Sequence, residues 1–245
     1  MIAAIDVSLA STTVGVFDDT RRDVVDVVTI EHALEAGEVS PVEWLGSIDE
    51  AWGRLGSPAV AAVGVAAFGS GLVTLDRDRR PVRTVWDDDR SQPDAGWCAK
   101  KLPPEWWRAE VGLVPEARHA VTKMSWLHRS EAENWVATQQ FALPVDFVVS
   151  ELAGIDRCVT STSSLSGYGL FRSSSDGPHT DVLTLIDSER DWSTVIPVIV
   201  PHDRPVGRWN DAVVLPGFDR DAIVTGLTKP QVVHEIARRA IDLLQ

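Results

Sequence analysis

The first 67 residues constrain the fold most strongly, because three strand-like runs precede the first helix. The runs are apolar or rich in β-branched residues, and they cover Met1 to Ile5, Thr13 to Phe17 and Asp23 to Ile30. Short connections join antiparallel strands, whereas parallel strands need a crossover of about a dozen residues or more. The connections between these runs are short, and Asp18-Asp19 is typical of a turn. The sequence therefore predicts a three-stranded antiparallel meander.

A helix and a buried strand are predicted after the meander. Pro41 to Leu55 carries apolar residues at helical spacing, with Ser40 at the N-cap position and Glu43 at the third helical position. Val60 to Ala67 is a continuous apolar run, typical of a strand that is buried on both faces. The order strand, strand, strand, helix and strand predicts an α/β fold in which helices are layered on a mixed sheet.

Shorter elements are predicted along the rest of the chain. The expected strands are Leu72 to Leu75, Thr84 to Trp86, Val195 to Val200 and Ala212 to Leu215. The expected helices include Lys123 to Leu127, Glu131 to Val136 and the amphipathic segment Lys229 to Leu244. Val145 to Leu152 is an apolar segment followed by Gly154, a residue suited to a helix C-cap. The chain is therefore expected to be mainly helical from Ser91 onward, before the late strands.

Composition excludes several classes of protein. Hydrophobic residues make up 44% of the 245 residues, which is enough to bury a core and argues against disorder. The net charge of −13 repels phosphate backbones, so we expect no nucleic-acid partner. The two cysteines, Cys98 and Cys158, do not form a disulfide framework. Neither a signal-peptide pattern nor an apolar run of membrane-spanning length is present, so we expect a cytoplasmic protein without a membrane partner.

Asp6 is the first candidate for a chemical role. It ends the first strand and is followed by a turn of small residues that includes Ser8, Ser11 and Thr12. A carboxylate at this position can orient Mg²⁺, while the hydroxyls and backbone N–H groups of the turn donate hydrogen bonds to phosphate oxygens. An Asp that only caps the turn after the strand is the alternative interpretation.

Two further candidates follow strand-like runs. In the segment Trp86 to Arg90, Asp88 and Arg90 can form hydrogen bonds with the hydroxyls of a polyol, and the Trp86 ring offers an apolar face. Asp219 follows a late strand and a Pro-Gly turn, where it can act as a general base. The alternatives are a solvated acidic turn for the first segment and an ordinary loop carboxylate beside Arg220 for Asp219. The sequence contains no P-loop, no dinucleotide-binding glycine motif and no Gly-x-Ser-x-Gly motif.

These segments resemble FGGY carbohydrate kinases, such as xylulokinases and glycerol kinases, in order and spacing. Pro81 to Arg90 is similar to the Pro-x-x-x-x-Trp-x-Asp-x-Arg segment of that family, and Lys123 to Leu127 is similar to its Lys-Leu-x-Trp-Leu helix. Similar matches are Ala4 to Asp6 with Val14 to Asp18, Gly64 to Ala66 with Val73 to Asp76, Phe141 to Gly154, and Pro201 to Gly207. The resemblance covers nearly the whole chain.

The resemblance implies an actin-like, ribonuclease-H-like layered domain with a mixed sheet whose first three strands are antiparallel. In that family an N-terminal half binds the sugar or polyol and a second half binds Mg-ATP. Asp6, with Ser8, Ser11 and Thr12, matches the position near the metal and the phosphates. Trp86, Asp88 and Arg90 match substrate-side residues, and Asp219 matches the catalytic base. We expect residues 1–210 to be the sugar-binding domain and 211–245 to be a hinge strand and helix remaining from the second domain.

Departures from the family pattern bear on activity. Where the family has Asp-x-Gly-Thr-Ser/Thr, this chain reads Asp6 to Ala10 as Asp-Val-Ser-Leu-Ala, so Leu9 replaces a hydroxyl. Phe68 to Ser70 replaces a Gln-Met-His segment, and Ser161 to Leu165 lacks the acidic residue of the family. A different alignment of Asp221 to Leu227, far into the second half, would describe an internally deleted kinase and would remove Asp219 from catalysis.

The resemblance therefore leaves three functions open. One is an ATP-dependent sugar or polyol kinase that needs an ATP-binding half, supplied by a separate chain, by missing residues or by a homo-oligomer. The second is a non-catalytic pseudokinase that binds a polyol or a protein partner. The third is a competent minimal phosphotransferase. We expect the chain by itself to bind Mg-ATP weakly or not at all.

Overall fold

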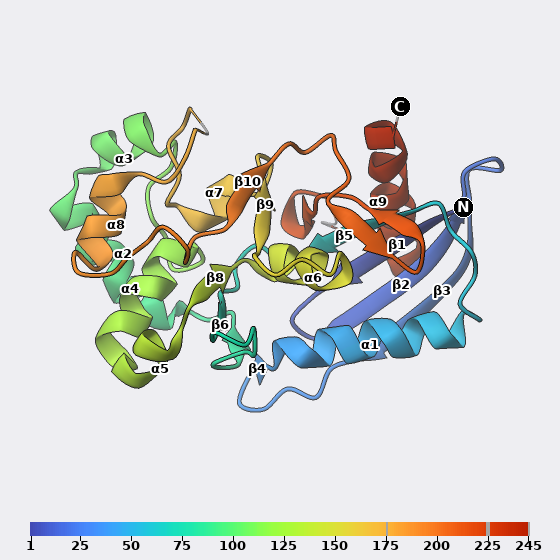
Figure 1. Cartoon of the computed structure of the whole chain (residues 1–245), viewed down its shortest axis with the longest axis horizontal. Helices are drawn as coiled ribbons and strands as arrows, with labels where there is room; N and C mark the ends of the chain where they lie inside the picture. The colour runs from blue at the N-terminus through green and yellow to red at the C-terminus, as the bar shows by residue number, and fades with distance from the viewer. Residues whose placement is uncertain (175, 224–225, 245) are drawn as a thin grey trace.

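A computed structural model describes residues 1–174, 176–223 and 226–244, and seven strands within these ranges form a mixed sheet (Figure 1). The order across the sheet is β11-β12-β5-β1-β2-β3, and β13 pairs with β5 beyond the end of β12. The strands are β1 (Ile2–Val7), β2 (Ser11–Asp18), β3 (Asp23–Glu31), β5 (Ala62–Ala67), β11 (Gly207–Trp209), β12 (Ala212–Val214) and β13 (Phe218–Asp219).

The strand directions confirm the predicted meander and the predicted mixed sheet. β1 pairs antiparallel with β2, and β2 pairs antiparallel with β3. β5 runs parallel to β1, because the helix α1 (Pro41–Arg54) provides the crossover between the meander and β5. β12 and β13 are both parallel to β5. The carboxyl ends of β1, β5 and β13 therefore meet at one edge of the sheet.

Helices cover both faces of the sheet. α1 and α6 (Pro144–Leu152) pack on one face, and α9 (Lys229–Leu244) packs on the other, against β1, β2, β3 and β5. Along β1, Ala3, Ile5 and Val7 belong to the core on the α1 side, whereas Ile2 and Ala4 belong to the core under α9. Since side chains alternate along a strand, Asp6 projects to the α9 face.

Two glycines let α9 approach the sheet closely. A Cβ atom on Gly15 of β2 would lie 2.4 Å from a methyl group of Val233. A Cβ atom on Gly64 of β5 would lie 3.1 Å from side-chain atoms of Ile236 and Ala240. Glycine therefore occupies the two strand positions at which residues of α9 approach the sheet most closely, and a larger residue there would collide with the helix.

The remaining helices gather at the end of the molecule away from β1, β2 and β3 (Figure 1). They are α2 (Gln92–Lys101), α3 (Pro104–Glu110), α4 (Ala120–Ser130), α5 (Ala132–Ala137), α7 (Leu165–Tyr168) and α8 (Thr180–Ile186). Three two-stranded pairs connect this end to the sheet: β4 (Glu38–Val39) with β7 (Val85–Trp86), β6 (Val73–Leu75) with β8 (Gln140–Ala142), and β9 (Val159–Ser161) with β10 (Val198–Val200).

The predicted N-cap position of Ser40 is confirmed, and two other expectations lie partly outside the described residues. Ser40 stands at the N-cap of α1, but its side chain makes no capping hydrogen bond. The carboxylate of Glu43 accepts instead from the backbone N–H of Ala33 at 2.5 Å, which ties the preceding loop to the helix.

The alternative alignment of residues 221–227 includes Val224 and Thr225, and the expected second domain ends at Gln245. The structure does not describe these three residues.

The described residues also bear on the predicted organisation of the chain. β11 lies before the expected boundary at residues 210 and 211, and β12 lies after it, yet both strands belong to the same sheet. The division into two domains stays a prediction.

Within the described ranges, no helix has the length and apolar character needed to cross a membrane.

Candidate functional site

Asp219 lies at the edge where the parallel strands end. It closes β13, opposite Ala67 of β5, and Ala67 lies opposite Val7 of β1. Its carboxylate accepts the backbone N–H of Asp221 at 3.0 Å and so caps the short 3-10 helix η2 (Arg220–Ala222). Burial raises the pKa of Asp219, although that hydrogen bond partly offsets the effect. A half-buried carboxylate with a raised pKa is suited to accept a proton.

A cavity of about 230 Å³ opens beside Asp219. We call it the Asp219 cavity, and it is lined by Gly69, Ser70, Leu113, Arg118, His119, Ser166, Gly167, Asp219 and Asp221. Its wall combines hydroxyl, carboxylate, imidazole and guanidinium groups with one leucine. Such a wall can form hydrogen bonds with several hydroxyl groups of one small ligand.

The histidine of this cavity has a defined hydrogen-bonding role. His119 Nδ1 accepts the backbone N–H of Glu116 at 2.9 Å. Burial lowers the pKa of His119 to about 4, so the ring is neutral at pH 7. Because Nδ1 is the acceptor, Nε2 carries the proton of the neutral ring. His119 can therefore donate one hydrogen bond from Nε2 without bringing a positive charge.

Sequence reasoning missed most of the lining of the Asp219 cavity. Gly69 and Ser70 lie two and three residues after β5, in the segment Phe68 to Ser70 that differs from the family pattern. A Cβ atom on Gly69 would lie 3.2 Å from Asp219 Oδ1, so glycine leaves space beside the carboxylate. The position of Gly69 after a buried strand was the available signal. Arg118 and His119 come from a loop, and their sequence neighbourhood gave no comparable signal.

Asp6 is fully buried and is paired with two basic side chains. Arg220 Nε donates to Asp6 Oδ1 at 2.6 Å, and Arg220 Nη2 lies 3.5 Å from Oδ2. Lys229 Nζ lies 3.8 Å from Oδ2 and donates to Ser11 Oγ at 3.0 Å. We call Asp6, Arg220 and Lys229 the Asp6 cluster. It joins β1 to both ends of the segment that connects β13 with α9.

The turn after Asp6 is closed by its own hydroxyl groups. Ser11 N–H donates to Ser8 Oγ at 2.9 Å, and Ser8 Oγ donates to the Ser11 carbonyl at 2.9 Å. The buried Thr12 hydroxyl is 2.8 Å from His32 Nε2, and His32 Nδ1 is 2.9 Å from the Leu9 carbonyl. These contacts fix the turn, and they engage hydroxyls that were predicted to bind phosphate. Their assignment as cofactor-binding residues stays a prediction.

The contacts at Asp6 do not suit the magnesium ion that the family implies. Both carboxylate oxygens already face a guanidinium or an ammonium group, which would repel a divalent cation. Nowhere in residues 1–174, 176–223 and 226–244 do three His, Cys, Asp or Glu side chains form a group that could hold a metal ion. Asp6 as a metal ligand stays a prediction, and the ion pairs argue against it.

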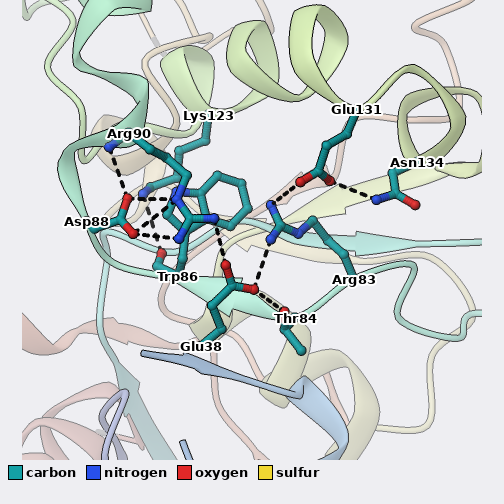
Figure 2. Close-up of polar contacts among 9 residues, drawn as sticks. All are labelled: Glu38, Arg83, Thr84, Trp86, Asp88, Arg90, Lys123, Glu131 and Asn134. Atoms are coloured by element: carbon teal, nitrogen blue, oxygen red, sulfur yellow. Dashed lines mark hydrogen bonds and ion pairs between the residues drawn. The ribbon is translucent and has the colours of Figure 1, made fainter. Parts of the chain in front are cut away.

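Trp86, Asp88 and Arg90 lie in a separate polar network (Figure 2). Arg90 donates to both oxygens of Asp88 and to Glu38, at distances between 2.6 and 3.0 Å. The Arg83 guanidinium lies 4.0 Å from the centre of the Trp86 ring, and Trp86 is fully buried. None of these side chains lines the Asp219 cavity. Substrate binding by Trp86, Asp88 and Arg90 stays a prediction.

Lys123 completes this network from α4. Its side chain is fully buried, with Nζ 3.4 Å from the Trp86 carbonyl and 4.9 Å from the centre of the Trp86 ring. Burial lowers the pKa of Lys123 to about 8, although the nearby Asp87 and Asp88 favour the charged form. The lysine of the predicted Lys-x-x-Trp-Leu helix therefore contacts the Trp86 segment from α4, which lies above Trp86 in the view of Figure 2.

The structure thus brings Asp6 and Asp219 to one edge and places the Trp86 segment elsewhere. Asp6 and Asp219 lie on strands that flank β5, so their Cα atoms are about 10 Å apart at ordinary strand spacing. Arg220 follows Asp219 directly and reaches Asp6. A polar cavity at the carboxyl ends of parallel strands is the usual place for a ligand site in α/β folds.

The chain belongs to the FGGY family of carbohydrate kinases, whose N-terminal domain matches residues 1–233. Among curated proteins, no sequence matches this chain significantly. The xylulose kinase of Bifidobacterium adolescentis has a similar structure, with a TM-score of 0.80 and 20% identity, covering 93% of this chain and 55% of that one. The predicted actin-like fold with a mixed sheet is confirmed.

Other solved kinases show the same similarity. The xylulose kinase of Rhodospirillum rubrum matches with a TM-score of 0.79 and 18% identity, over 92% of this chain and 51% of that chain. The Plasmodium falciparum glycerol kinase, solved with ADP, matches with a TM-score of 0.77 and 15% identity, over 89% and 48%. The chain spans about half the length of these kinases, and identities this low show a shared fold only.

Proposed function

We propose that the Asp219 cavity binds a sugar or polyol and that Asp219 is the general base for its phosphorylation. One observation carries the proposal: the carboxylate of Asp219 is half-buried in a cavity of about 230 Å³ at the ends of the parallel strands. The raised pKa of Asp219 and the mixed polar wall support the same assignment. Membership of a carbohydrate kinase family supports the class of substrate.

In this mechanism the chain's own residues hold the sugar and move one proton. His119 Nε2 and the Ser70 hydroxyl donate hydrogen bonds that orient the sugar. The hydroxyl to be phosphorylated donates to Asp219, which takes its proton as the oxygen attacks. ATP, the phosphoryl donor expected for the family, supplies the transferred group when it is bound by an ATP-binding half. A separate chain or a second copy of this chain is the proposed source of that half.

A thermal-shift screen of sugars and polyols without nucleotide tests the binding step. A ligand present at about 100 times its Kd stabilises the folded state and raises the melting temperature by about 5–10 °C for a chain of this size. Arg118→Ala, which changes the cavity wall, should reduce that shift, whereas the exposed Arg21→Ala should not. No shift with any sugar or polyol would contradict the proposed site.

Asp219→Asn tests the catalytic step with the ligand that the screen identifies. The variant should keep sugar affinity within about tenfold. In cell extract that supplies an ATP-binding half, it should lower sugar-dependent ADP formation by about 10²–10⁴-fold, because the amide cannot accept the proton. Asp221→Asn is the matched control, since Asp221 lines the same cavity and should change the rate much less. Binding without any ADP formation, even with cell extract added, would favour the non-catalytic pseudokinase.

A further inference from the structure

In the Asp6 cluster, the basic side chains of Arg220 and Lys229 lie beside Asp6. The family resemblance predicts a metal ion at this position. Asp6 has no exposed surface, and each of its carboxylate oxygens lies within 3.8 Å of a basic nitrogen. The side chain of Arg220 is 22% exposed, so its pairing with Asp6 is screened only partly by water. A buried carboxylate needs such partners, because an ion without them is costly to bury.

The partners of Asp6 come from the last part of the chain. Arg220 belongs to η2, directly after Asp219, and Lys229 begins α9. Lys229 also donates to Ser11 Oγ, so it contacts both strands that flank the turn after Asp6. The Asp6 cluster therefore fixes the segment that carries Asp219 and the first turn of α9 against the edge of β1 and β2.

We propose that Arg220 and Lys229 supply at Asp6 the positive charge that a metal ion would otherwise bring, so that Asp6 anchors η2 and the first residue of α9 and does not bind a metal. This inference rests on the ion pairs and not on the proposed sugar site. It assigns Arg220 a positioning role, because the same residue that pairs with Asp6 fixes the position of the neighbouring Asp219.

A double-mutant cycle in the full chain tests the anchoring role. Asp6→Asn and Arg220→Gln should each lower the melting temperature by about 5–10 °C, because each leaves a buried group without its partner. The double variant should lose clearly less than the sum of the two losses, since the second change removes a group that is already unpaired. Arg220→Lys, which keeps the charge, should retain part of the stability if Arg220→Gln does not fold. The exposed pair Arg238 and Asp242, changed by Asp242→Asn, is the control and should lose little.

Manganese binding tests the second part of the proposal. Mn²⁺ at 1–5 mM, chosen as about the concentration that saturates weak sites, should shift the melting temperatures of the wild type and Asp6→Asn equally. Spectroscopic titration of free Mn²⁺ should also give the same binding for both proteins.

Losses of melting temperature that add up in the double-mutant cycle would overturn the anchoring role. Binding or stabilisation by Mn²⁺ that disappears in Asp6→Asn would overturn the absence of a metal at Asp6.

Discussion

Asp146, which lies at the third position of α6, is a buried carboxyl group that should make the stability of the protein depend on pH. The carboxyl group is almost completely buried beside Tyr168, whose hydroxyl donates to Asp146 Oδ2 at 2.5 Å. The backbone N–H of Leu143 donates in turn to the Tyr168 hydroxyl at 3.0 Å. Burial raises the pKa of Asp146 to about 7, against the partly offsetting effect of the Tyr168 hydrogen bond. The native protein therefore keeps a proton on Asp146 well above the usual range for a carboxyl group.

Stability should fall as the pH rises from about 4 to 7, because of Asp146. In this window the unfolded chain has released the proton, with a pKa near about 3.9, while the native state still holds it. In this window the native state binds more protons than the unfolded chain. The contribution of Asp146 to the free energy of unfolding therefore decreases by about 1.4 kcal/mol for each unit by which the pH rises. Asp146→Asn should remove this slope. Denaturant unfolding of both proteins between pH 4 and 8 measures it, and equal slopes would contradict the assignment.

At the scale of elements, the packing of α9 on the sheet depends on the absence of side chains at Gly15 and Gly64. α9 is amphipathic, and its apolar residues Val232, Val233 and Ile236 are buried against the strands. The helix also begins with a local hydrogen bond, since the Gln231 side chain accepts the backbone N–H of Thr228 at 2.9 Å. The helix itself is encoded locally, but its docking requires space on strands far away in the sequence.

Gly15→Ala should destabilise the protein by about 1–3 kcal/mol, the usual cost of overpacking a core. The new methyl group would lie 2.4 Å from Val233, so the helix or the strand must shift. Gly46→Ala is the matched control, because Gly46 lies within α1 with nothing near its Cβ position. That control should be neutral or stabilising by about 0.5–1 kcal/mol. Urea unfolding measures both changes, and equal effects would show that α9 does not constrain Gly15.

At the scale of the whole molecule, the chain joins a sheet with two helical layers to a helical end that carries the Trp86 network (Figure 1, Figure 2). The Asp219 cavity takes its lining from both parts. Gly69 follows β5 and Asp219 closes β13, whereas Arg118 and His119 precede α4 and Ser166 belongs to α7. A sugar bound in the Asp219 cavity should therefore stabilise both parts of the molecule together.

Mg-ATP should bind this chain with a Kd weaker than about 1 mM. Asp6 is engaged by Arg220 and Lys229, and Leu9 stands where the family has a hydroxyl donor. Phosphoryl transfer depends on holding the nucleotide from several sides, so the loss of these contacts weakens the whole clamp. Calorimetric titration measures the affinity, with MgCl₂ alone as the control. Micromolar binding by the chain would contradict this expectation and would support a competent kinase.

The sequence by itself determined the order of the elements and the class of fold. The strands β1, β2, β3 and β5 and the helices α1 and α9 were predicted close to their observed bounds, because each carries a strong local pattern. Asp6 was predicted at the end of the first strand and Asp219 after a late strand and a turn. The structure adds the short strand β13 at Asp219, and parallel pairing brings the carboxyl ends of neighbouring strands to one edge.

Only the tertiary structure decided which polar groups are free and which are already paired. Asp6 is 214 residues away from Arg220 in the sequence, and Glu38 is 52 residues away from Arg90, so no local pattern predicts either pair. Ion pairs and cavities depend on the three-dimensional approach of distant segments, whereas strands and helices depend on periodicity within a few residues. For this reason the sequence located the edge that carries Asp219, and the fold decided that Asp6 is neutralised there by the chain itself.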